Sequence, residues 1–125
     1  MTVELIDTTA PSIICPVNQT YFVDALCQKS IPDYLSTLAV TDNCAIGEEL
    51  MLTQNPAAGT IISGHNTNQT VIITATDNSG NSTQCTFDIT LKDTLNPTII
   101  CPADLTINVD TDCEVTIDNL SLIHI

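Results

Sequence analysis

The 125-residue chain carries 15 acidic residues against two lysines, which gives a formal net charge of −13 at pH 7. This charge disfavours binding to nucleic acid or to an anionic membrane by bulk electrostatic attraction. Aromatic residues make up 3% of the chain and tryptophan is absent, so a platform for stacking bases or sugar rings is poorly supplied. No apolar run approaches the ~20 residues of a membrane-spanning helix, and membrane insertion is not expected.

The chain repeats itself. The segment DTTAPSIICP, which begins at Asp7, returns as DTLNPTIICP at Asp93, 86 positions later, and Cys27 and Cys113 fall at the same offset. A period of this size is typical of one small β-domain per repeat, so the pattern predicts a tandem array.

The repeat predicts four parts of the chain. Residues 1–6 match the last strand of a complete unit and are interpreted as the final strand of a preceding repeat, residues 7–92 form a complete repeat, and residues 93–119 begin the next. Residues 120–125 depart from the repeat and coincide with the translation of a transposon-end sequencing adapter. We therefore interpret this hexapeptide as an artefact of sequence assembly.

Short alternating segments between turn residues predict eight strands in the complete unit. In chain order they are residues 12–15, 19–23, 27–31, 38–41, 49–54, 60–63, 70–76 and 83–92. The last is the clearest, because Cys85, Phe87, Ile89 and Leu91 alternate with polar residues and predict one buried face. The turn at 77–81 joins the last two strands as a hairpin. The pattern predicts an all-β, immunoglobulin-like β-sandwich.

The complete unit contains four cysteines, Cys15, Cys27, Cys44 and Cys85. An even count without a Cys-x-x-Cys motif favours disulfides over a metal site, and disulfides imply an extracellular location. First and last strands are commonly neighbours in such sandwiches, which predicts the pair Cys15–Cys85. Cys27 and Cys44 are both expected at the end where the chain leaves the unit, which predicts the pair Cys27–Cys44.

Several short motifs resemble the hyalin repeat (HYR) family. They are Asp7…Pro11…Cys15-Pro16, Ile31-Pro-Asp-Tyr34, Thr41-Asp-Asn-Cys44, Gln54-Asn-Pro-Ala-Ala-Gly59, Ala75-Thr-Asp77-Asn-Ser-Gly-Asn81 and Cys85-Thr-Phe87. The match covers residues 7–92 in full and 93–119 in part, and it resembles the four-cysteine form found in large secreted proteins of Bacteroidetes-type bacteria. The resemblance implies an immunoglobulin-like extracellular module associated with cell adhesion.

No catalytic constellation is predicted. A nucleophile needs a base within hydrogen-bond reach, and His65 lies in a polar loop without an obvious partner. We expect that the protein is not an enzyme.

Calcium is the candidate ligand, because Ca²⁺ takes oxygen ligands from carboxylates, amides and carbonyls. Asp7, Asp77 and Asn81 are expected where the chain enters the unit, and Asp42 and Asp93 where it leaves, so a junction between repeats would gather them. The simpler interpretation, which we favour, is that these are turn and linker residues.

The main functional hypothesis is a non-catalytic, disulfide-stapled stalk or adhesion module of a large secreted or cell-surface protein. Its partners would be neighbouring repeats of the same chain, cell-surface proteins or glycans. One alternative is a specific glycan-binding module that uses the loops near His65 or the threonine-rich outer faces. The other is an accessory domain of a secreted hydrolase whose catalytic part lies elsewhere.

Overall fold

The computed structural model describes residues 1–44 and 50–116 of the chain. It divides the chain into two compact units, Met1–Thr94 and Leu95–Ile125, close to the boundary that the repeat predicts. The hexapeptide at 120–125 lies outside the described residues, so its interpretation stays a prediction.

The described residues of the first unit form strands of two to eleven residues and one 3₁₀ turn. Its elements are β1 (Ser12–Ile13), β2 (Gln19–Phe22), β3 (Gln28–Ser30), η1 (Leu35–Thr37), β4 (Val40–Thr41), β5 (Met51–Asn55), β6 (Ile61–Ser63), β7 (Asn68–Thr76) and β8 (Ser82–Lys92). Each of the eight predicted segments overlaps one of these strands. Residues 1–6 precede the first strand with exposed side chains, and their assignment to a preceding repeat stays a prediction.

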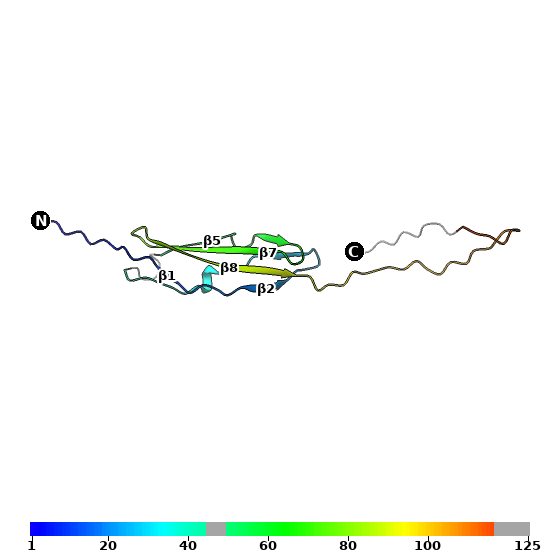
Figure 1. Ribbon diagram of the computed structural model, residues 1–125, viewed down its shortest axis with the longest axis horizontal. Helices are drawn as coiled ribbons and strands as arrows, with labels where there is room; N and C mark the ends of the chain where they lie inside the picture. The colour runs from blue at the N-terminus through cyan, green and yellow to red at the C-terminus, as the bar shows by residue number, and fades with distance from the viewer. Residues whose placement is uncertain (45–49, 117–125) are drawn as a thin grey trace. The chain divides into compact units, whose positions relative to one another are not determined.

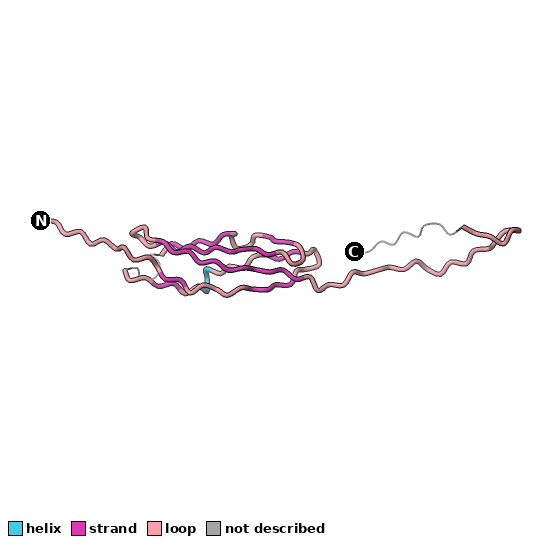
Figure 2. Tube along the Cα trace, viewed as in Figure 1, coloured by secondary structure: helices cyan, strands magenta, loops and turns pink. Residues whose placement is uncertain are grey.

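The strands form a sandwich rather than one continuous sheet. Four strands pair in the order β2-β8-β7-β5, while β1 pairs with β4 and β3 pairs with β6 in two smaller sheets. Figure 1 and Figure 2 show these strands running along the long direction of the first unit. The predicted fold class, an all-β sandwich, is confirmed.

Alternation along the two longest strands builds the core. Val71, Ile73 and Ala75 of β7 have no exposed surface, and Ile89 and Leu91 of β8 are equally buried, while their sequence neighbours are partly exposed. The predicted inward face of β8 is therefore confirmed. Ile31, directly after β3, and Ile62 of β6 close the core. Burying each of these Val, Ile and Leu side chains contributes roughly 1.5–3 kcal/mol.

The first unit has two poles, at opposite ends of β8. At the N-terminal pole the chain enters at Asp7, whose carbonyl oxygen accepts a hydrogen bond from Asn81 Nδ2 at 3.0 Å, just before β8 begins. At the C-terminal pole β8 ends at Lys92, and the Cys27 carbonyl accepts from Gly64 N at 3.0 Å. The eleven residues of β8 separate the poles by about 37 Å, at ~3.4 Å per residue. Figure 1 shows the chain entering beside β1 and leaving at the arrowhead of β8.

The second unit, as far as it is described, repeats one local feature of the first. In the first unit Cys27 N donates to Asp24 O at 2.9 Å; in the second, Cys113 N donates to Asp110 O at 3.1 Å. Both cysteines have a positive φ, 58° and 57° respectively. The same turn thus forms at both positions, although the tandem array itself stays a prediction.

Candidate functional site: the two poles of the repeat unit

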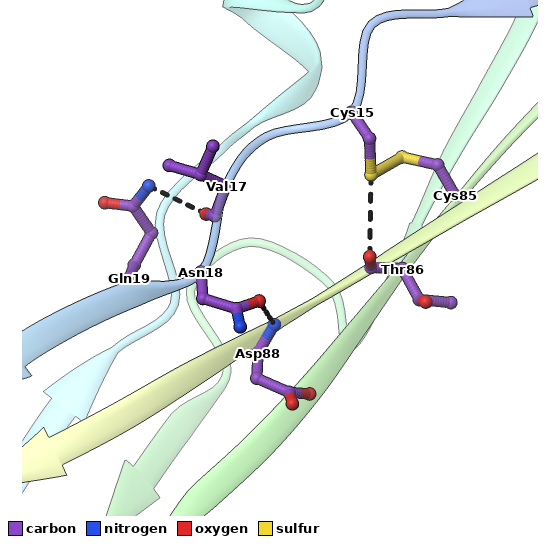
Figure 3. Close-up of a disulfide and its surroundings, with 7 residues drawn as sticks. All are labelled: Cys15, Val17, Asn18, Gln19, Cys85, Thr86 and Asp88. Atoms are coloured by element: carbon purple, nitrogen blue, oxygen red, sulfur yellow. Dashed lines mark hydrogen bonds between the residues drawn. A yellow bond between two sulfur atoms is a disulfide. The ribbon is translucent and has the colours of Figure 1, made fainter.

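A disulfide joins the first and last segments of the unit. Cys15, just after β1, is bonded to Cys85 in β8, with 5.8 Å between their Cα atoms and a sequence separation of 70. Figure 3 shows the bond crossing from the incoming chain to β8. This is the pairing expected for neighbouring first and last strands. In the chain-entropy model a loop of this length stabilises the fold by about 4 kcal/mol.

Beyond the disulfide, a parallel ladder continues the contact between the same two segments. Asn18 Oδ1 accepts a hydrogen bond from Asp88 N at 2.9 Å (Figure 3), and β2 then pairs with β8 from Gln19 opposite Ile89 to Phe22 opposite Lys92. The first and last segments are therefore held together over most of the length of β8.

The predicted disulfide Cys27–Cys44 is wrong for this unit. Both cysteines are free and exposed, and they lie at opposite poles. Cys27 belongs to the C-terminal pole, whereas Cys44 follows Asn43, whose Nδ2 donates to Asp7 Oδ1 at 3.2 Å at the N-terminal pole. A disulfide requires Cα atoms within about 7 Å, so the two cannot be bridged within one unit.

Cys27 and Cys44 lie at opposite poles because β3 and β4 run in the same direction. β3 starts at the C-terminal pole and runs away from it, antiparallel to β6. β4 pairs antiparallel with β1, which itself runs away from the N-terminal pole, so β4 runs toward that pole. β3 and β4 therefore run the same way, and the segment between them, which includes η1, carries the chain onward instead of turning it back.

The N-terminal pole gathers three carboxylates. One oxygen from each of Asp7, Asp42 and Asp77 lies within 4.8 Å of the others. Asn81 joins them, since its Nδ2 contacts Asp77 Oδ2 at 2.8 Å and also Asp7 O. The predicted position of Asp42 at the opposite end is wrong, because β4 delivers it to this pole. Asp93 lies at the C-terminal pole, so the structure does not bring it into this cluster.

Asp77 is part of this cluster because it continues the inward alternation of β7. It occupies the next inward position after Ala75 and is only 7% exposed. Burial alone would raise the pKa of its carboxyl, but hydrogen bonds from the Asn81 side chain and from the amides of Asn81, Ser79 and Gly80 lower that pKa below its usual value. Asp77 is therefore a buried, hydrogen-bonded anion at neutral pH.

The cluster also affects the Cys44 thiol. Desolvation, then the neighbouring carboxylates of Asp7, Asp42 and Asp77, raise the pKa of Cys44. Both lysines lie toward the other pole: Lys29 Nζ is 5.1 Å from the centre of the Tyr21 ring, and Lys92 Nζ donates to Asn66 Oδ1 at 2.8 Å. The N-terminal pole is thus strongly acidic.

The oxygen-rich character of this cluster fits the ligand preference of calcium. Carboxylates of Asp7, Asp42 and Asp77 could each supply one oxygen. Many of the same atoms, however, already accept hydrogen bonds within turns, as Asp77 Oδ1 does from Ser79 N at 2.8 Å. Calcium binding stays a prediction for this pole.

At the C-terminal pole, His65 holds the departing chain. Its Nδ1 accepts a hydrogen bond from Asp93 N at 3.0 Å. Next to it, Asn66 N donates to Leu91 O at 2.8 Å. The sequence carries no signal for this role, because the partners are 28 residues apart and belong to different loops. The described geometry gives His65 a positioning role at the end of β8.

The described residues of the first unit define a disulfide-linked all-β sandwich domain whose chain enters and leaves at opposite poles. The family model of the HYR domain matches residues 6–91, and the chain belongs to this family. HYR domains form a non-enzymatic, extracellular repeat family, and the Cys15–Cys85 disulfide indicates an oxidising environment. Searches of curated proteins and of solved structures find no match. Among residues 1–44 and 50–116, no helix is long and apolar enough to cross a membrane.

Proposed function

We propose that this chain is a stalk module of a large secreted or cell-surface adhesion protein, in which tandem repeats transmit tension between the cell and a distal binding partner. The observation that carries this proposal is the position of the Cys15–Cys85 disulfide relative to the two poles. The bond lies on the direct path between the point where the chain enters and the point where it leaves.

The force path follows from this connectivity. Tension applied at Asp7 passes along the chain to Cys15, crosses the disulfide to Cys85, and leaves along β8 through Lys92. The residues between the two cysteines lie off this path and cannot be stretched while the bond is intact. One repeat under load could then extend to only about 60 Å, the length of its roughly 17 loaded residues.

The β2–β8 ladder adds a second, non-covalent resistance. Because β2 and β8 are parallel, pulling the chain by its ends tends to slide one strand along the other and loads their hydrogen bonds together. Val23 N extends the ladder with a bond to Lys92 O at 3.0 Å. This arrangement protects the fold when the disulfide is reduced.

Single-molecule force spectroscopy on several copies of residues 7–92 joined in tandem tests the proposal. Oxidised repeats should show almost no length gain, whereas repeats in a thiol reductant should each lengthen by about 240 Å when they unfold. A tandem with Cys15→Ala, Cys85→Ala and Cys27→Ser keeps neither of the two possible pairs of cysteines and should lengthen fully without reductant. Cys27→Ser is the matched control and should leave the oxidised trace unchanged.

Large extensions from oxidised repeats would refute the stalk proposal. The distal partner, a cell-surface protein or a glycan, is a further part of the proposal that a glycan array addresses with the same protein. The glycan-binding alternative would be favoured by two results together. One isolated repeat would bind a glycan saturably, and oxidised repeats would show large extensions under load. A catalytic domain in the flanking gene sequence would instead favour the accessory role in a secreted hydrolase.

A further inference from the structure

The two poles of the unit each carry one free, exposed cysteine. Cys27 lies at the C-terminal pole and Cys44 at the N-terminal pole. Within one unit they cannot meet. In a tandem array, however, the C-terminal pole of one repeat is followed directly by the N-terminal pole of the next.

One residue, Asp93, connects the two poles across such a junction. Its backbone N–H is bonded to His65, the neighbour of Gly64, whose own N–H is bonded to Cys27 O at 3.0 Å. By the 86-residue period, Asp93 is also the counterpart of Asp7 in the following repeat. In the unit described, Asn43 Nδ2 donates both to Asp7 Oδ1 and to Cys44 Sγ, each at 3.2 Å. The hydrogen bonds of His65 and Gly64 thus link Asp93 to the Cys27 turn, and by the 86-residue period the same position takes the place that Asp7 has beside Cys44.

Charge also favours this head-to-tail contact. The N-terminal pole presents Asp7, Asp42 and Asp77, while both lysines lie toward the C-terminal pole. The C-terminal pole also holds the carboxylates of Asp24 and Asp93, so the complementarity comes from the placement of the lysines rather than from a uniformly basic surface. This placement makes the C-terminal pole less acidic than the N-terminal pole, so unlike poles repel each other less than two N-terminal poles do.

The turn that holds Cys27 is well defined. Asp24 Oδ1 accepts hydrogen bonds from Leu26 N at 2.9 Å and Gln28 N at 3.0 Å. The turn at Cys113 has the same backbone bond and the same positive φ. A left-handed position is one that glycine or asparagine fills with less strain, yet both copies have cysteine there.

We propose that Cys27 of one repeat forms a disulfide with the counterpart of Cys44 in the following repeat. This inference rests on the tandem stalk proposed above. Its consequence is that two kinds of disulfide alternate along the array: Cys15–Cys85 within each repeat and Cys27–Cys44 across each junction. Covalent bonds then limit bending at the junctions as well as extension of the repeats.

The bond forms by thiol–disulfide exchange with a disulfide oxidant of the extracytoplasmic compartment. The thiolate of one cysteine attacks the oxidant, forms a mixed disulfide and releases one oxidant thiolate. The second cysteine loses its proton to solvent and attacks the sulfur of the first, which releases the other oxidant thiolate. The two protein thiols are oxidised, and the oxidant disulfide is reduced to a dithiol.

The test uses two copies of residues 7–92 joined directly, because Met1–Thr94 is a compact unit with its own core. In the matched pair tandem, Cys44→Ser in the first copy and Cys27→Ser in the second leave only the predicted partners. In the mismatched pair tandem, Cys27→Ser in the first copy and Cys44→Ser in the second leave the two cysteines at the far poles. Both are oxidised with a glutathione redox buffer, and monomers are separated on a non-reducing gel and assayed for free thiols by alkylation and mass spectrometry.

The matched monomer should lose both free thiols. The fraction of monomers without free thiols should be at least tenfold higher for the matched tandem than for the mismatched tandem. Two free thiols in a matched monomer that retains both Cys15–Cys85 bonds would overturn the proposal, and so would equal oxidation of both tandems. The stalk proposal is judged separately by the force experiment on the Cys27→Ser repeats, which lack the junction bond. Inextensible repeats with free matched thiols would therefore reject the junction disulfide alone.

Discussion

The two poles of the repeat unit differ in how they are held and in what they present. Close to the N-terminal pole, a covalent bond between Cys15 and Cys85 joins the incoming chain to β8. At the C-terminal pole no disulfide of the described residues holds the end of β8, which is held by the β2–β8 ladder, the His65 hydrogen bond and the buried Leu91 side chain. The first pole is acidic, whereas both lysines lie toward the second.

Because of this difference, the two ends of the unit are not equivalent. With unlike poles that carry one free cysteine each, the proposed junction disulfide pairs the C-terminal pole of one repeat with the N-terminal pole of the next. The covalent bond lies near the point where the chain enters, so under the proposed load an intact disulfide carries the tension and leaves β2 unloaded. The experiments that follow alter one pole at a time, so that the contribution of each can be measured.

The largest effect should come from removing the covalent fastening. Cys15→Ala with Cys85→Ala in residues 7–92 should lower the free energy of unfolding by about 4 kcal/mol, since the unfolded chain is no longer closed into a long loop. The melting temperature should fall by more than about 15 °C, measured by circular dichroism. Cys27→Ser at the other pole is the control and should change little. Equal losses from both variants would remove the proposed difference between the poles.

The next effect concerns the buried carboxylate of the N-terminal pole. Because the folded pKa of Asp77 is lowered, its stabilising contribution is present above the unfolded value near 4 and is lost as the pH falls through the folded pKa. The free energy of unfolding of the wild type, measured with urea, should therefore fall as the pH drops below about 4. In Asp77→Asn this free energy should depend less on pH over the same range. Ser79→Ala, in the same turn, should keep the wild-type acid response. An unchanged profile in Asp77→Asn would show that other carboxylates dominate.

Much of the fold could be predicted from alternation and turn chemistry. β7 and β8 alternate so regularly that their inward faces and the turn at 77–81 follow from the sequence. The disulfide Cys15–Cys85 also follows, because its two segments are the first and last of a sandwich. These features depend on local patterns or on a general property of the fold class.

The positions of Cys44 and Asp42 could not be predicted in the same way. They depend on whether the chain reverses between β3 and β4, and the segment containing Pro32 and Tyr34 is compatible with either outcome. The direction is set by tertiary contacts: Gln54 Nε2 donates to Pro32 O at 2.9 Å, and its Oε1 accepts from Tyr34 N at 2.9 Å. A glutamine on β5 thus fixes the path of a segment 20 residues earlier.

A smaller change in stability is expected from adding calcium, which would act on the N-terminal pole alone. If the carboxylates of Asp7, Asp42 and Asp77 bind Ca²⁺ with a Kd near 1 mM, typical of weak extracellular sites, 10 mM calcium should stabilise residues 7–92 by about 1.4 kcal/mol. The melting temperature would rise relative to a chelator, and Asp42→Asn would abolish the rise. Asp88→Asn, away from both poles, is the matched control. Equal melting temperatures in calcium and chelator would reject the metal prediction and leave the turn interpretation.

The smallest expected effect lies in the Cys27 turn of the C-terminal pole. Cys27 has a φ of 58°, which costs a residue with a Cβ about 1 kcal/mol, and Cys27→Gly removes that cost. Part of the gain is lost to the greater freedom of glycine in the unfolded chain, so the unfolding free energy should rise by only about 0.5 kcal/mol. The reciprocal change at the same pole, Gly64→Ala, should destabilise, since its φ is 103° and a Cβ there would lie 2.6 Å from Thr67 Oγ1. Chemical denaturation of both variants measures whether the free energy of unfolding rises in Cys27→Gly and falls in Gly64→Ala. A loss of stability in Cys27→Gly would mean that the cysteine side chain contributes to the fold of the single repeat, and the case for a role at the junction would weaken accordingly.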